Sequence, residues 1–271
     1  MIPYYPEPLL HLGPVTIPAF RVTLVAAVLL GGYIMVTRAV RLKVGGQLMF
    51  DASRWAVVVG FIGAHAAKVA MDYHADFIAN PMMMFSTEGG IRSIGGLAGG
   101  LIGMLMFCLL WKRLSFLATF RLLDVMAYSM PFAFAVGRLG CFLVHDHRGI
   151  ASTSWIAVRF PEGSRYDLGL IECLFLVALS IVFWSLARRT RPAGFFLAGY
   201  GLVYGVFRIW LDTLHIQPMR FWEGGALAMM GAAAILITVF HSAPARRGPS
   251  ALPSSDRSPD RLQMCAEEQH H

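Results

Sequence analysis

Apolar residues are grouped into long runs along this chain, separated by short polar segments. Each run has about 17 to 25 residues, the length of helix that crosses the hydrocarbon core of a bilayer. The runs cover residues 17–36, 55–71, 93–111, 122–144, 168–187, 193–210 and 225–241. The pattern predicts an all-α fold, a polytopic integral membrane protein with seven transmembrane helices.

Composition agrees with a membrane protein. Of the 271 residues, 56% are hydrophobic and only 14% are charged, whereas a soluble domain carries about 25% charged residues. The formal net charge of +7 is placed in the loops, so it does not indicate nucleic-acid binding. The four cysteines are scattered without the spacing of a disulfide framework or a zinc site. We expect no cofactor and no metal, since His145, Asp146 and His147 alternate at a helix end and form a poor tetrahedral set.

The basic residues between the runs predict the orientation. Alternate segments hold fourteen Lys and Arg residues on one side and five on the other, and the richer side faces the cytoplasm. The N-terminus is therefore expected outside and the C-terminus inside. Residues 1–242 form the expected membrane domain. Residues 243–271, rich in Pro, Ser and charge, are expected to be a disordered cytoplasmic tail.

Four cations lie inside the apolar runs, and a charge in hydrocarbon marks a functional site by default. They are Arg21, Lys68, Arg138 and Arg208. With this orientation, all four lie within roughly 5–10 Å of the outer boundary, at 1.5 Å per helical residue. Taken singly, Arg21 or Lys68 is more simply explained by snorkelling to the headgroups.

Carboxylates accompany these cations at the same depth. Glu172 lies near the outer end of the fifth run, and Asp146 and Asp212 lie at the outer exits of the fourth and sixth. Arg208 and Asp212 share a helix face through their i,i+4 spacing. A cation-rich cavity open to the outer leaflet would suit a phospholipid phosphate, which Arg binds through its planar fork.

Glycines are concentrated at the outer half of the third run. Gly95 and Gly96 belong to the stretch GGIRSIGGLAGGLIG. Backbone N–H groups near the start of that helix could bind an anion. The alternative is close helix packing, which also requires small residues.

Two motifs resemble those of a known family, the prolipoprotein diacylglyceryl transferases. The family signature Gly-Arg-x-Gly-Asn-Phe, followed by x-Asn-x-Glu and x-x-Gly, is similar to the stretch GRLGCFLVHDHRG, residues 137–149. Cys141 and Val144 replace its two Asn residues, and Asp146 replaces its Glu. A second motif, Tyr-Gly-x-x-Arg-Phe-x-x-Glu, is similar to the stretch from Tyr204 to Asp212.

The resemblance covers roughly residues 1–242 and implies a transferase of the bacterial inner membrane whose active site faces the periplasm. Such an enzyme moves the diacylglyceryl group of phosphatidylglycerol to the thiol of a lipobox cysteine in a prolipoprotein signal peptide, during lipoprotein biosynthesis. The residues expected to bind substrate are Arg21, Gly95, Gly96, Arg138, Glu172, Tyr204, Arg208 and Asp212. The catalytic residues expected are Arg138, Asp146, His145, His147 and Arg208.

The two motifs do not identify the general base that would deprotonate the acceptor thiol. The resemblance implies a His before the Gly-Gly of the third run, where this chain has Ile94. We therefore expect His145 or His147 to activate the thiol, the alternative being that both are solvated side chains at the rim. A further alternative is a catalytically altered paralogue that binds phospholipid or acts as a membrane scaffold. An intramembrane hydrolase is disfavoured, because no Gly-x-Ser-x-Gly is present.

Overall fold

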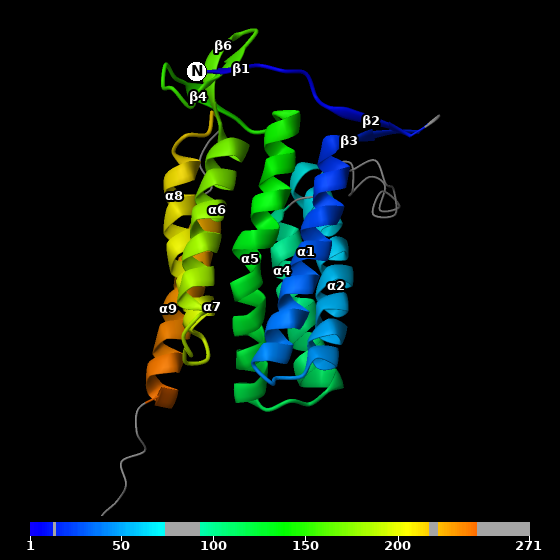
Figure 1. Cartoon of the computed structure of the whole chain (residues 1–271), viewed down its shortest axis with the longest axis vertical. Helices are drawn as coiled ribbons and strands as arrows, with labels where there is room; N and C mark the ends of the chain where they lie inside the picture. The colour runs from blue at the N-terminus through cyan, green and yellow to red at the C-terminus, as the bar shows by residue number, and fades with distance from the viewer. Residues whose placement is uncertain (13–14, 74–92, 217–221, 243–271) are drawn as a thin grey trace, which may run out of the picture.

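The computed structural model describes residues 1–12, 15–73, 93–216 and 222–242. Its helices run along the long axis of an elongated bundle, and strands lie at one end of it (Figure 1). The predicted tail 243–271 lies outside the described residues. The helical segments are α1 (Ala19–Arg41), α2 (Gly46–Asp72), α4 (Ser93–Leu105), η2 (Met106–Trp111), α5 (Phe116–Val144), α6 (Leu168–Leu186), α7 (Phe195–Gly199), η3 (Tyr200–Tyr204), α8 (Gly205–Asp212) and α9 (Trp222–Ser242).

Each apolar run is helical over most of its length, although residues 17–18 belong to β3 and residues 193–194 to the turn before α7. Among the described residues, five helices are long and apolar enough to cross a membrane, and Gly95–Trp111 and Gly224–Thr238 are shorter apolar helices. The segment Phe195–Asp212 is one of the five and contains α7, η3 and α8 in succession. The chain is therefore a multi-pass membrane protein, and the count of seven spans stays a prediction.

The helices extend beyond the apolar runs at several ends. Arg38 and Arg41 belong to the last turn of α1, and α5 begins at Phe116 and so includes Arg121. These arginines were predicted in loops. A helix can continue past the hydrocarbon core because its backbone stays hydrogen-bonded in water as well, so the apolar run is shorter than the helix.

Helix α5 is the central element of the bundle. It lies between α1, α2 and α4 on one side and α6, α8 and α9 on the other (Figure 1). Two apolar clusters of buried side chains pack around it, one reaching α1, α2 and η2 and the other reaching α6, α7, η3 and α9. Near its start, the Asp124 carboxylate accepts hydrogen bonds from the backbone N–H groups of Phe196 (2.7 Å) and Leu197 (3.0 Å), which caps α7 and ties it to α5.

Glycines bring α2 and α4 into backbone contact. A Cβ on Gly63 would lie 2.6 Å from the carbonyl oxygen of Gly95, and one on Gly99 would lie 2.6 Å from that of Val59. Small residues permit this approach, which provides van der Waals contact where lipid gives no hydrophobic driving force. Helix packing thus accounts for Gly95, and the predicted binding role of Gly95 and Gly96 stays a prediction.

Six short strands among the described residues correct the all-α prediction, because this part of the chain is mostly helical with two small sheets. The sheet of order β1-β5-β6-β4 pairs β1 with β5 in parallel and the other neighbours antiparallel, and β2 and β3 form an antiparallel pair. Their length of two to five residues is too short to give a readable period-2 pattern. The strands are β1 (Ile2–Pro3), β2 (Leu9–Leu12), β3 (Val15–Pro18), β4 (Arg148–Ala151), β5 (Val158–Phe160) and β6 (Gly163–Asp167).

Candidate active site

Two arginines from different helices meet on one carboxylate near the end of the bundle that carries the sheets. Arg138 of α5 places its Nε 2.9 Å from Oε2 of Glu172 on α6, and Arg208 of α8 places an Nη 3.3 Å from the same oxygen. The Glu172 side chain is only 1% exposed. The two guanidinium groups, which the sequence places at one depth in the membrane, thus lie close together with Glu172 between them.

Further polar groups complete this buried cluster. The Tyr204 hydroxyl donates to Oε1 of Glu172, and the other Nη of Arg208 lies 3.4 Å from Oδ1 of Asp212. Two guanidinium groups therefore face two carboxyl groups. Paired in this way, the cations are tolerable inside an apolar bundle.

Tyr200 brings an additional hydroxyl close to the cluster. It lies at the start of the π-helical segment η3, and its ring stacks on that of Tyr204 with centroids 5.0 Å apart. In the described part of the chain, its hydroxyl is buried without a hydrogen-bond partner. π-helical turns are rare in proteins, and those that occur are often found at functional sites. A buried hydroxyl without a partner calls for an explanation, and a polar ligand that accepts from it is one.

His145 ends α5 and reverses the chain. Its φ of 52° and ψ of 39° are left-handed, and its Nδ1 lies 2.7 Å from Oδ2 of Asp167. The ring is packed among Tyr4, Tyr5, Phe142 and Phe160. Of the two histidines considered as the base, His145 therefore holds the loop together, and a catalytic role for it stays a prediction.

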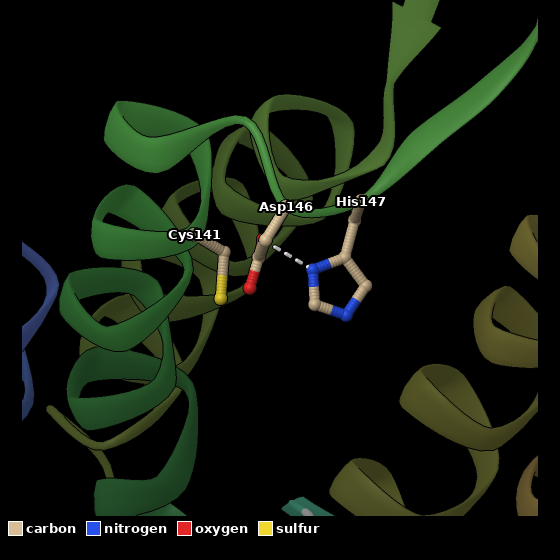
Figure 2. A group of neighbouring side chains, drawn as sticks. All are labelled: Cys141, Asp146 and His147. Carbon is tan, nitrogen blue, oxygen red and sulfur yellow. Dashed lines mark hydrogen bonds and ion pairs between the residues drawn. The ribbon is translucent and has the colours of Figure 1, made fainter. Parts of the chain in front are cut away.

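The reversal at His145 places Asp146 and His147 beside Cys141, as Figure 2 shows. His147 Nδ1 is hydrogen-bonded to Asp146 Oδ1. Cys141 Sγ accepts from an Nη of Arg138 at 3.8 Å, so these three side chains adjoin the arginine cluster. Burial lowers the pKa of His147, but hydrogen bonds to Asp146 and Cys141 outweigh it and raise this pKa to about 9.

His215 is a site residue that sequence reasoning missed. Its Nε2 lies 3.9 Å from Oδ1 of Asp212. Burial and the charge of Arg208 lower the pKa of His215 to about 4, so it is neutral at pH 7. The turn that carries it is joined to the signature by the bridge between Gly149 and His215. The i,i+3 spacing from Asp212 was the available sequence signal.

Arg21 is separate from this cluster. It lies on α1 with its side chain exposed, and among the described residues the ion pairs of the cluster do not include it. Its predicted contact with substrate stays a prediction.

We expect Asp167→Ala to destabilise the protein by about 2–4 kcal/mol. The buried Asp167 carboxylate caps α6 by accepting from Leu170 N at 3.2 Å and also bonds His145. Thermal unfolding in detergent measures the loss, and Asp167→Asn should retain part of the cap. The control is Asp51→Ala, whose carboxylate meets the exposed Arg54 at 4.0 Å. If the thermal midpoints of Asp167→Ala and Asp51→Ala were equal, Asp167 would not stabilise the fold through the cap of α6 and the bond to His145.

A bundle of apolar helices with a buried arginine–carboxylate cluster near one end defines a multi-pass membrane protein with a polar site inside its apolar bundle. Residues 7–243 match the family model described as prolipoprotein diacylglyceryl transferase. The chain belongs to this family.

Three similar proteins share the name phosphatidylglycerol--prolipoprotein diacylglyceryl transferase. That of Parasynechococcus marenigrum (strain WH8102) is 28% identical over 79% of this chain and 82% of its own length. That of Leifsonia xyli subsp. xyli (strain CTCB07) is 28% identical over 79% of this chain and 73% of its own length. That of Shewanella sp. (strain ANA-3) is 32% identical over 64% of this chain and 63% of its own length.

Proposed function

We propose that this protein transfers the diacylglyceryl group of phosphatidylglycerol to the thiol of the lipobox cysteine of a prolipoprotein. The names of its relatives support the reaction. The observation that carries it is the convergence of Arg138 and Arg208 on Glu172 within an apolar bundle. The alternative of a catalytically altered scaffold predicts lipid binding without turnover, and the comparisons give it no support.

The reaction forms a bond between sulfur and the glyceryl carbon and breaks the bond between that carbon and the phosphate oxygen. The electron pair stays on the departing glycerol phosphate, where negative charge increases. Arg138 and Arg208 are the groups proposed to stabilise this charge, in a site of low dielectric where fixed donors are most effective. Glu172, which accepts a hydrogen bond from the Tyr204 hydroxyl, holds the two guanidinium groups in position, and Asp212 holds Arg208.

The topology proposed has seven spans, an outward N-terminus and a cytoplasmic C-terminus, in the bacterial inner membrane. The arginine cluster and the sheets lie at one end of the bundle, and α1 ends at the other with Arg38 and Arg41 in its last turn. Arg188 and Arg189 follow the end of α6, on the same side as Arg41. The positive-inside rule makes the Arg41 end cytoplasmic, so the cluster faces the periplasm.

A transfer assay with purified protein in vesicles tests the proposal. A lipobox peptide is incubated with vesicles containing phosphatidylglycerol, and the peptide's gain of a thioether-linked diacylglyceryl group is followed by mass spectrometry. We expect transfer with phosphatidylglycerol, and none when the cysteine of the peptide is replaced by serine. Vesicles of phosphatidylcholine alone should give at most about a hundredth of the rate, because the departing group then carries a cation. Binding of phosphatidylglycerol without any transfer would favour the scaffold alternative.

A further inference from the structure

Three different donor side chains point to one place beside the arginine cluster. The Cys141 sulfur, an Asp146 carboxylate oxygen and a His147 ring nitrogen all lie within 4.8 Å of one another (Figure 2). Cys141 is on the last turns of α5, and the other two follow the left-handed turn at His145. The fold, not the sequence spacing, brings them together.

The chemistry of this set matches one metal better than others. Thiolate sulfur and imidazole nitrogen are the preferred ligands of Zn²⁺, and carboxylate oxygen is its third common ligand. Zinc bonds of about 2.0–2.3 Å put tetrahedral ligand atoms roughly 3.3–3.8 Å apart, and the three donor atoms here lie within 4.8 Å of one another. Binding would replace the direct hydrogen bond between His147 and Asp146 with a bond from each to the metal. Three protein ligands leave one position open, which is the arrangement of catalytic zinc sites.

The surrounding charges permit a cation. The Cys141 thiolate and the Asp146 carboxylate together would balance the two charges of Zn²⁺. Arg138 is a neighbouring cation at 3.8 Å from Cys141 Sγ, but its Nε is bound to Glu172 at 2.9 Å, so its charge is offset.

We propose that Cys141, Asp146 and His147 bind Zn²⁺ and that its open position takes the acceptor thiol as a thiolate. The metal site stands on the geometry, and the role for the acceptor rests on the proposed function. On coordination the acceptor thiol releases its proton to solvent. Its sulfur then attacks the glyceryl carbon, the carbon–oxygen electron pair leaves with glycerol phosphate, and the metal keeps its oxidation state. The metal would thus activate the acceptor thiol, the role that the sequence analysis assigns to His145 or His147 as a general base.

Metal binding is tested on the full chain, purified with a tag free of histidine. The tail residues Cys265, His270 and His271 are changed to alanine in every sample, because they could bind metal adventitiously. We expect about one equivalent of zinc by mass spectrometry of the metal. Titration with Co²⁺ should give the thiolate-to-cobalt charge-transfer band in the near ultraviolet.

The variants identify the ligands. Cys141→Ser should abolish the charge-transfer band and lower metal affinity at least about 100-fold, and Asp146→Asn and His147→Gln should each lower it at least about 10-fold. Cys108→Ala, a change of another buried cysteine, should keep band and affinity. Thermal unfolding shows that each variant is folded. The proposal would be overturned if Cys141→Ser gave a charge-transfer band as strong as that of the protein with Cys141. It would also be overturned if the protein with Cys141 bound no cobalt.

Adding the acceptor distinguishes this proposal from the proposed function. A lipobox peptide should intensify the charge-transfer band of the cobalt protein, since a second thiolate binds, and the serine peptide should not. Metal-free protein that transfers lipid at the full rate would sink the zinc role and leave the proposed function intact. Zinc bound at this site in a protein that never transfers lipid would retain the metal site and remove the proposed function.

Discussion

Arg138→Ala is expected to lower the rate of diacylglyceryl transfer at least about 100-fold, the usual effect of removing one donor that stabilises developing charge. Arg138 is buried, and its Nε is 2.9 Å from Glu172, so water cannot readily replace it. The loss should be mainly in kcat, because the phosphate gains charge as the carbon–oxygen bond breaks. The peptide transfer assay in phosphatidylglycerol vesicles measures it.

Two companion variants separate this role from a general loss of charge. Arg138→Lys keeps the cation but not the planar fork, and should restore only part of the rate. Arg54→Ala removes an exposed cation that meets Asp51 at 4.0 Å and lies 5.8 Å from the centre of the Phe50 ring, and should transfer at the wild-type rate. A folded Arg138→Ala protein with wild-type kcat would show that the cluster does not stabilise the departing phosphate.

The helices could be predicted because their cause is local. A run of apolar residues as long as the bilayer is thick has few alternatives to a helix, since every backbone polar group must then be satisfied within the segment. The ends of α1 and α5 were misplaced because Arg41 and Arg121 are polar but still helical. The strands were missed because pairing between β1 and β5 joins residues more than 150 positions apart, a contact that no local pattern reveals.

The candidate site was only partly predictable for the same reason. Depth along each helix showed that Arg138, Glu172 and Arg208 lie at one level, but it could not show that both arginines bind one carboxylate oxygen. That requires the rotation of three helices, which packing determines. The grouping of Cys141 with His147 depends on a single left-handed residue, His145. Only a few per cent of non-glycine residues adopt that conformation, and the enrichment of His among them is too small to predict it at one position.

Glu172→Gln is expected to destabilise the protein by about 3–5 kcal/mol, because it leaves the buried Arg138 and the largely buried Arg208 without their shared carboxylate. The substitution keeps the shape and one acceptor oxygen, so the effect reports the lost charge. A thermal midpoint lower by at least about 6 °C should follow, at roughly 2–4 °C per kcal/mol. The measurement is thermal unfolding in a neutral detergent without phospholipid, and Asp51→Asn, at a half-buried carboxylate that pairs with the exposed Arg54, should leave the midpoint unchanged.

Anionic lipid should reverse part of this loss, which links the stability of the cluster to its proposed ligand. A phosphate that binds between Arg138 and Arg208 supplies the negative charge that Glu172→Gln removes. Phosphatidylglycerol should therefore raise the midpoint of the variant more than that of the wild type, since a ligand that binds only the folded state stabilises it by its affinity. Phosphatidylcholine carries a compensating cation, so it should shift the midpoints of the variant and the wild type equally. Equal shifts of both proteins with phosphatidylglycerol would mean that the lipid phosphate binds elsewhere, and the arginine cluster would then be structural only.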